Sequence, residues 1–161
     1  SDVQKLLSSD LAPDLRRAFL LGCYAGLRVA EAAALDWADV DGDACTVTVR
    51  EGKGGKSRVV DVSPLLIDWL GDRCAGNVVS GSLYPNSPAR LQRRLNRAIK
   101  AAGVDVTTHS LRHRWGMVAY QSSGDLLAVA EMMGHSSINT TKIYAQASSD
   151  VKKKIASAVM R

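Results

Sequence analysis

The chain has 161 residues, of which 46% are hydrophobic and 23% charged, a balance typical of a folded soluble protein rather than a disordered one. No apolar run approaches about 18 residues and no charged-then-apolar leader is present, so we expect neither a membrane span nor a signal peptide, and the cytoplasm is the default location. The net charge of +5 points to a polyanionic partner only if the basic residues cluster on one face. The length fits one domain, and a start at Ser1 rather than at methionine favours a fragment of a longer protein.

Helices and a hairpin are predicted in the first half. Over residues 13–35 the apolar residues recur at helical spacing, interrupted at residues 25–28 (AGLR), which predicts two helices joined by a sharp bend. Two β-branched runs, 46–49 and 58–62, flank the glycine-rich segment 51–56 and predict a β-hairpin whose tip carries lysines. Ser63 and Pro64 then predict the start of a further helix.

A basic helix is predicted from Ser87 and Pro88 to Gly103. Its buried stripe is formed by Leu91, Leu95, Ile99 and Ala102. Its other faces carry five basic residues and no acidic one, so they are suited to face phosphate; these are Arg90, Arg93, Arg94, Arg97 and Lys100.

Three shorter helices and an amphipathic tail are predicted after it. Thr107 or Thr108 caps a helix that runs to about Gln121, and Asp125 caps one that ends at Gly134. Ser136 or Ser137 caps the helix that carries Tyr144, and the apolar residues of segment 150–161 lie on one stripe. The predicted fold class is therefore mainly α with a small antiparallel β-sheet, an α+β fold.

Several residues suit phosphate chemistry, although each also has an ordinary interpretation. His109 and Arg112 are three residues apart at a helix start, where a bidentate arginine and a histidine donor make a good phosphate site; a single histidine there more often caps or packs. Arg28 and Glu31 have the same spacing, and their pairing could be purely structural or could hold a guanidinium group for a ligand.

Two other classes of site are not favoured. The tip GKGGKS at 52–57 resembles a Walker loop, but Arg50 stands where that pattern needs glycine and the segment joins two strands. The three histidines lack a partner motif for a metal, and the three cysteines are far apart and form no C-x-x-C pair, so no metal site is predicted. The residues concerned are His109, His113, His135, Cys23, Cys45 and Cys74.

Five segments in succession resemble the signature boxes of the tyrosine recombinases, the phage-integrase family. They are AGLRVAE at 25–31, EGKGGK at 51–56, HSLRH at 109–113, MGHSS at 133–137 and TTKIY at 140–144. The resemblance extends from about Leu15 to Gln146 and implies the fold of the family's catalytic domain over residues 1–161. The sequence departs from the family pattern at Arg114 and Trp115, where smaller residues are usual.

The resemblance implies a reaction on DNA. Tyr144 would attack a phosphodiester and form a 3′-phosphotyrosyl link with release of a 5′-hydroxyl, while Arg28 and Arg112 would hold the non-bridging oxygens. Lys53, rather than Lys56, would protonate the departing 5′-oxygen as general acid. Because the phosphotyrosine conserves the energy of the phosphodiester, neither metal nor nucleotide cofactor is implied.

The remaining implied roles concern the surroundings of the phosphate. His109 would be a base or positioning group, and His135 would donate a hydrogen bond to a phosphate oxygen. Glu31, and also His113, would orient the residues that touch the phosphate. The basic helix would contact double-stranded DNA.

The resemblance also implies partner molecules and a further domain. Members of the family act as homotetramers on two DNA attachment sites, some with accessory DNA-bending proteins, and have an N-terminal core-binding domain for which nothing here provides. We therefore expect the isolated domain to be monomeric and to bind DNA weakly. Segment 150–161 either passes to a neighbouring protomer or folds back on its own core.

The function implied is that of a phage or mobile-element integrase. The alternatives left open are a chromosome-dimer resolvase, a type IB topoisomerase-like enzyme, and a DNA-binding module that has lost catalysis.

Overall fold

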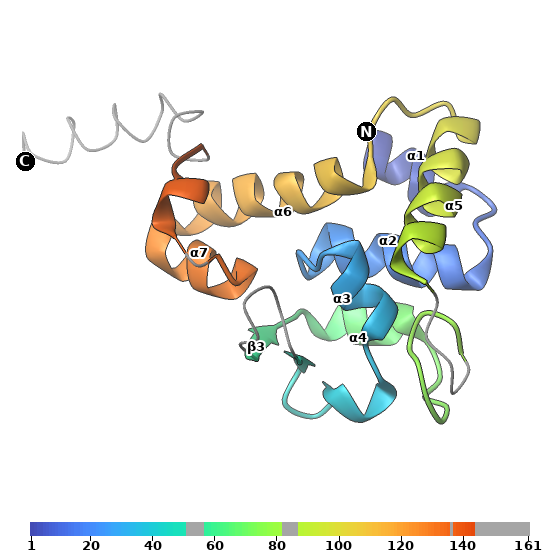
Figure 1. Ribbon diagram of the computed structural model, residues 1–161, viewed down its shortest axis with the longest axis horizontal. Coiled ribbons are helices and arrows are strands. Elements are labelled where there is room, and N and C mark those ends of the chain that lie inside the picture. The colour runs from blue at the N-terminus through green and yellow to red at the C-terminus, as the bar shows by residue number, and fades with distance from the viewer. Residues whose placement is uncertain (51–56, 82–86, 136, 144–161) are drawn as a thin grey trace, which may run out of the picture.

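The computed structural model describes residues 1–50, 57–81, 87–135 and 137–143 (Figure 1). The elements in chain order are α1 (Asp2–Ser8), α2 (Pro13–Tyr24), α3 (Val29–Ala34), η1 (Trp37–Asp39), β1 (Val40–Asp41), β2 (Thr46–Val49), β3 (Arg58–Asp61), α4 (Pro64–Leu70), α5 (Pro88–Ala101), α6 (Thr108–Ser123), α7 (Leu126–Met133) and η2 (Ile138–Thr140). The predicted fold class, mainly α with a small antiparallel sheet, is confirmed.

Helix α2 lies at the centre of the fold and packs against α3, α4, α5 and α6. It begins with Pro13, whose fixed φ suits the first helical position, and it buries Leu15, Phe19 and Cys23 as their helical spacing predicted. The bend predicted at residues 25–28 is confirmed, since α2 ends at Tyr24 and α3 begins at Val29.

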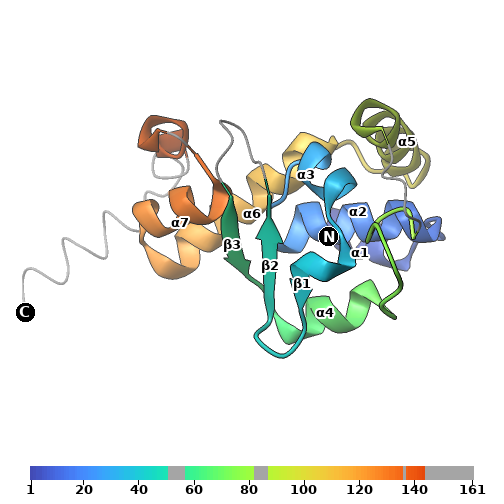
Figure 2. The ribbon, with the colours of Figure 1, turned by 60° about the horizontal axis from the view of Figure 1, so that its bottom comes forward.

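The predicted hairpin forms strands β2 and β3, which pair antiparallel with Val47 opposite Val60. Val47, Val49 and Val60 face the core, while Val59 points to solvent, in the alternation expected of a half-buried sheet. A short edge strand, β1, which the sequence did not reveal, pairs with β2. The three strands lie side by side, and β3 is the strand that packs against α7 (Figure 2).

Three of the predicted helix starts are confirmed by their caps. Ser63 caps α4, Thr107 caps α6 and Asp125 caps α7 through side-chain oxygens that accept backbone N–H groups. Ser137 caps only the 3-10 turn η2 within the described residues. Ser136 and the expected helix around Tyr144 lie outside them, as does segment 150–161.

The apolar stripe of helix α5 is buried as predicted, except at the C-terminal end of the helix. Leu91, Leu95 and Ile99 are buried, whereas Ala102 is half-buried and lies just beyond the last helical residue. Gly103 follows it with φ +71°, the left-handed conformation that terminates a helix.

Two clusters of buried side chains organise the described part of the molecule. The larger surrounds α2 and the buried face of the sheet, and the smaller joins α6 and α7 through Tyr120, Val129 and Met133. Helix α6 runs along the molecule from α5 to α7 and so connects the two clusters (Figure 1). None of the helices in the described ranges is long and apolar enough to cross a membrane.

Candidate active site

Glu31 lies at the centre of a cluster of arginines. Its carboxylate accepts hydrogen bonds from Arg28 Nη1 at 2.9 Å and from Arg58 Nη1 and Nη2 at 2.8 and 3.0 Å. Arg112 Nη1 is 3.9 Å from Glu31 Oε2. Burial alone would raise the pKa of Glu31, but the hydrogen bonds and charges of Arg58 and Arg28 outweigh it and hold the pKa at about 2. The carboxylate is therefore ionised at neutral pH.

Arg28 owes its position to the bend that precedes it. Glu31 also accepts the backbone N–H of Arg28 at 2.8 Å, so the same carboxylate starts α3 and holds the guanidinium group. Gly26 has φ +67°, and a Cβ there would lie 2.8 Å from the ring of Trp115, whose Nε1 donates to the Tyr24 carbonyl at 3.1 Å. The large residue at position 115 therefore packs against the bend and supports it.

Arg112 is the most buried of these cations, with 5% of the residue exposed. Its position follows from the Thr107 cap, which starts α6 one turn earlier. Its guanidinium group donates to the carbonyls of Gly26 and of Met133, the latter at 2.6 Å. A buried cation requires such partners, and these tie the bend before Arg28 to the end of α7.

Arg58 is a residue that the sequence analysis missed. It is the first residue of β3, its side chain is 12% exposed, and its Nε donates to the Met132 carbonyl at 2.8 Å. Its position just after the lysine-bearing segment 51–56 suggested only a strand residue. No spacing rule relates it to Glu31, 27 positions earlier.

His135 follows the C-terminal end of α7. Gly134 ends that helix with φ +64°, and the backbone N–H of His135 donates to the Ala130 carbonyl at 3.0 Å, the 6→1 bond of a Schellman motif. The imidazole Nδ1 lies 2.6 Å from the hydroxyl oxygen of Thr141, which is fully buried. Thr141 is a second residue that the sequence analysis missed.

The surroundings of His135 keep its imidazole neutral. Burial lowers its pKa, and the charges of Arg112, Arg28 and Arg58 lower it further; Glu31 opposes them, and the pKa falls to about 4. At neutral pH the ring therefore has one N–H donor and one acceptor nitrogen.

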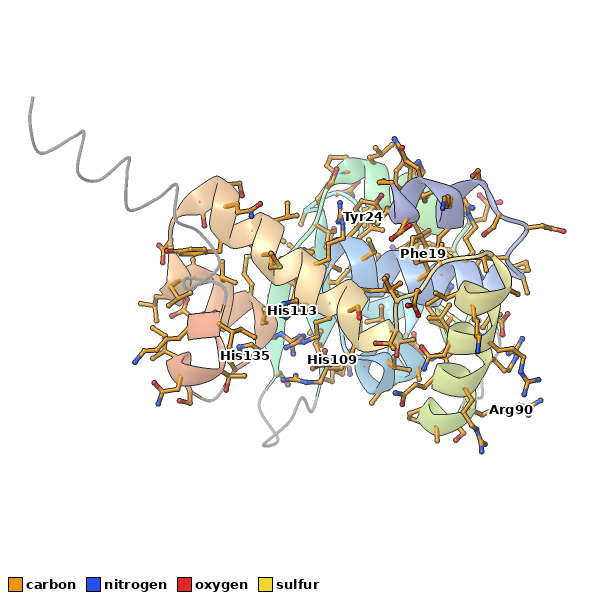
Figure 3. The ribbon with its side chains drawn as sticks, turned by 90° about the horizontal axis from the view of Figure 1, so that it is seen from above. Phe19, Tyr24, Arg90, His109, His113 and His135 are labelled. Carbon is orange, nitrogen blue, oxygen red and sulfur yellow. The ribbon has the colours of Figure 1, made fainter. Side chains whose placement is uncertain are left out.

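A surface cavity of about 250 Å³ adjoins this cluster. It is lined by Arg28 and residues 27, 29 and 30 of the same segment, by Thr108, His109 and Arg112 of α6, and by Gln92 of α5. His109 is exposed there, whereas His113 is half-buried one turn further along α6 and is not among the lining residues. Figure 3 shows His109, His113 and His135 around the same part of α6.

The structure thus brings together five of the eight predicted site residues, namely Arg28, Glu31, His109, Arg112 and His135. His113 is on the same helix and half-buried. Lys53 and Tyr144 lie outside the described residues. Strand β3, which follows Lys53 in the chain, and turn η2, which precedes Tyr144, both pack against α7.

The predicted DNA-binding helix, α5, does not present all five basic residues alike. Arg90, Arg93, Arg97 and Lys100 are exposed, and Figure 3 shows Arg90 on α5, well away from the histidines. Arg94 forms an ion pair with Asp14 of α2, so its charge is partly compensated within the molecule. Within the described ranges no three His, Cys, Asp or Glu side chains are grouped so as to hold a metal ion.

Comparison with known proteins gives consistent matches. The profile of the phage integrase family matches residues 2–150. Tyrosine recombinase XerC of Chromobacterium violaceum is 39% identical over 147 residues, which are 84% of this chain and 49% of that protein. Tyrosine recombinase XerA of Thermococcus onnurineus is 33% identical over 156 residues, which are 89% of this chain and 55% of that protein.

Solved structures share the fold. The catalytic domain of bacteriophage HP1 integrase superposes with a TM-score of 0.71 at 25% identity, covering 96% of this chain and 90% of that one. The crystal structure of XerA recombinase gives a TM-score of 0.76 at 26% identity, covering 99% of this chain and 63% of that one. The chain spans about half the length of the curated relatives named above. The chain belongs to the phage integrase family, that of the tyrosine recombinases.

Proposed function

We propose that the protein is a site-specific DNA recombinase that cleaves and rejoins strands through a 3′-phosphotyrosyl intermediate on Tyr144. The observation that carries this proposal is the cluster of Arg28, Arg112 and Glu31 beside an open cavity. It is supported by membership of the phage integrase family and by 39% identity to a tyrosine recombinase.

The cluster suits a phosphodiester that gains charge as it reacts. Three guanidinium groups surround one carboxylate, which leaves an excess of positive charge; Arg28 and Arg112 also line the cavity. Arginine forks are planar and permanently charged, so they can hold two phosphate oxygens while negative charge builds up in the transition state. Glu31 fixes these forks before the substrate arrives, which reduces the cost of ordering them.

The histidines have separate roles in this proposal. His109 lines the cavity, where it is placed to position the tyrosine hydroxyl or accept its proton. When the Thr141 hydroxyl donates a hydrogen bond to Nδ1 of neutral His135, the ring carries its proton on Nε2 and donates from there to a phosphate oxygen. His113 orients its neighbours without touching the phosphate.

Proton transfers complete the reaction. Tyrosine has an ordinary pKa of about 10, so its attack at neutral pH needs the nearby positive charge and a base. The oxygen that leaves phosphorus needs a proton, which we assign to Lys53, a residue between β2 and β3 in the chain. The phosphotyrosyl bond keeps the energy of the phosphodiester, so rejoining needs no nucleotide.

We propose that the DNA partner is a double-stranded attachment site contacted by the exposed basic residues of α5. The XerH recombinase, whose chain shares this fold at a TM-score of 0.73 and 23% identity, was solved bound to its difH substrate. A homotetramer on two duplexes, exchange of segment 150–161 between protomers, and help from DNA-bending proteins belong to the same proposal. Such an enzyme would act in the cytoplasm of a bacterial host.

A second candidate is a chromosome-dimer resolvase, a subtype with the same chemistry, which the identity to XerC and XerA recombinases favours. A plasmid carrying two directly repeated copies of one site separates the two subtypes. A resolvase acts on two identical sites, whereas an integrase needs two different attachment sites.

The proposed reaction is tested with the full-length protein and end-labelled DNA that carries its attachment site, including nicked suicide duplexes. We expect wild-type protein to form a covalent adduct at the 3′ end of the cleaved strand, visible on a denaturing gel and unaffected by EDTA. Tyr144→Phe should form none, while Tyr120→Phe, which alters a buried tyrosine of α6, should form wild-type amounts. Wild-type protein that binds this DNA without forming an adduct would instead support a DNA-binding module.

A further inference from the structure

The guanidinium group of Arg58 donates hydrogen bonds to two residues that belong to different parts of the site. Nη1 and Nη2 donate to the two oxygens of Glu31 at 2.8 and 3.0 Å, in the bidentate geometry of a strong charge-assisted pair. Nε donates to the carbonyl of Met132 at 2.8 Å. The side chain therefore bridges α3 and the end of α7 from its base on β3.

The carbonyl groups that Arg58 and Arg112 hold are adjacent. The last carbonyls of a helix have no partner within it, and here Met132 binds Arg58 while Met133 binds Arg112. Both arginines also lie beside Glu31, at 2.8 and 3.9 Å. The end of α7, two residues before His135, is thus fixed to the same carboxylate that orients the phosphate-facing arginines.

Gly134 leaves room for this bridge. A Cβ at that position would lie 2.8 Å from Arg58 Nη1 and 3.0 Å from its Cζ and Cδ. The absence of a side chain at position 134 therefore lets Arg58 pass directly over the turn that leads to His135.

We propose that Arg58 is a positioning residue, which acts through Glu31 and the Met132 carbonyl to hold Arg28, Arg112 and His135 in one arrangement. The proposal rests on the recombinase function proposed above, because that function gives the held groups a common phosphate. Arg58 itself is 12% exposed and does not line the cavity that Arg28, His109 and Arg112 share. It is not assigned contact with DNA.

The alternative is that Arg58 merely stabilises the fold. Arg17 provides a matched control, since its Nε also donates to a helix-end carbonyl, that of Leu70, at 2.9 Å, and its guanidinium group also donates to a second carbonyl, that of Val78. Those contacts join α2 to the end of α4 and to the loop that follows, and none of them belongs to the site. Arg17→Met therefore reports what losing a half-buried structural arginine does by itself.

The first test is the single-turnover rate of adduct formation at saturating DNA, measured well below the unfolding temperature of each variant. We expect Arg58→Met to lower the rate about 100-fold with little change in DNA affinity, as displacement of reacting groups by about 1 Å can do. Arg58→Lys should not restore it, because an ammonium group cannot hold both carboxylate oxygens and the carbonyl. Arg17→Met should keep the wild-type rate.

A double-mutant cycle shows whether Arg58 acts through Glu31. If it does, the rate loss in Arg58→Met combined with Glu31→Gln should be well below the product of the two separate losses. Losses that multiply, a rate restored by Arg58→Lys, or an unchanged rate in Arg58→Met would each overturn the proposal.

An NMR titration of the His135 imidazole tests, without any reaction, whether Arg58 lies close enough to the ring for its charge to act on it, as the positioning role requires. Removing the nearby Arg58 charge should raise the pKa of His135 in Arg58→Met, because Glu31 then faces the ring with less compensation, and Arg17→Met should leave it unchanged. If wild-type protein forms no adduct, the recombinase function fails, and this titration alone decides on Arg58. An unshifted His135 in Arg58→Met would overturn the positioning role.

Discussion

Gly134 serves two purposes at the end of α7. It adopts φ +64°, which terminates the helix, and it leaves the space that the Arg58 guanidinium group occupies. Gly124 ends α6 with nearly the same φ, +68°, but a Cβ there would meet nothing within 4 Å. Substitutions at the two glycines therefore distinguish the cost of the left-handed backbone conformation from the effect of crowding Arg58.

We predict that Gly124→Ala lowers the free energy of unfolding by about 1–2 kcal/mol, the cost of the left-handed conformation, and leaves adduct formation unchanged. Gly134→Ala should cost more and should also slow adduct formation, because the new methyl group displaces Arg58. Urea denaturation and single-turnover cleavage measure the two effects. Equal losses in both variants would show that Arg58 tolerates the methyl group.

Helix α5 shows how one element divides its basic residues between binding and structure. Arg93 and Arg97 are exposed, whereas Arg94 is paired with Asp14. Only the exposed residues are free to displace counterions from a DNA phosphate, and that displacement sets the salt dependence of binding.

We predict that Arg93→Gln and Arg97→Gln each weaken DNA binding and reduce the slope of log K against log salt by about 1. Arg94→Gln should keep the slope and lower the free energy of unfolding by up to about 1 kcal/mol, as expected for a partly exposed pair. Fluorescence anisotropy at several salt concentrations gives the slopes. If the slope changes for Arg94→Gln and not for the other two, α5 meets DNA through a different face.

At the scale of the whole molecule, the site makes stability depend on pH. The pKa of His135 is lowered from 6.5 to about 4, so between these values the unfolded chain binds a proton that the folded protein does not. The pKa of Glu31 is lowered from 4.5 to about 2, which has the same effect in a more acidic window. Acid therefore lowers stability in both cases, because Glu31 loses the charge that pairs with the arginines and His135 must take up a charge that its buried, cationic surroundings disfavour.

We predict that the free energy of unfolding falls as pH is lowered from about 6.5 towards 4, and that His135→Gln flattens this part of the curve. Glu31→Gln should flatten the part below pH 4.5 and should lower stability at neutral pH, since three arginines lose their common carboxylate. Urea denaturation at a series of pH values measures both. A slope that survives His135→Gln would assign the upper window to another group.

Most of the elements of this protein could be predicted from local sequence. Helical spacing placed α2 and α5, and the cap residues Thr107 and Asp125 marked the starts of α6 and α7, because these features act within one or two turns. The edge strand β1 was missed because two residues carry no periodicity and depend on β2 for pairing.

The residues of the candidate site also fall into those that the sequence predicted and those that it did not. Arg28, Glu31, His109, Arg112 and His135 were identified from short motifs, and the structure brings them together. Arg58 and Thr141 were missed, since their partners, Glu31 and His135, are set by how β3, η2 and α7 pack rather than by spacing in a motif.

The sequence by itself determined the family and the types of residue that the proposed reaction requires, because motif order and helical spacing are properties of the chain. Only the tertiary structure decided which charges compensate one another. It paired Arg94 with Asp14, placed Glu31 between Arg28 and Arg58, and kept the imidazole of His135 neutral by burying it among cations. Burial and charge pairing depend on distances between segments far apart in the chain, and those distances exist only once the helices have packed.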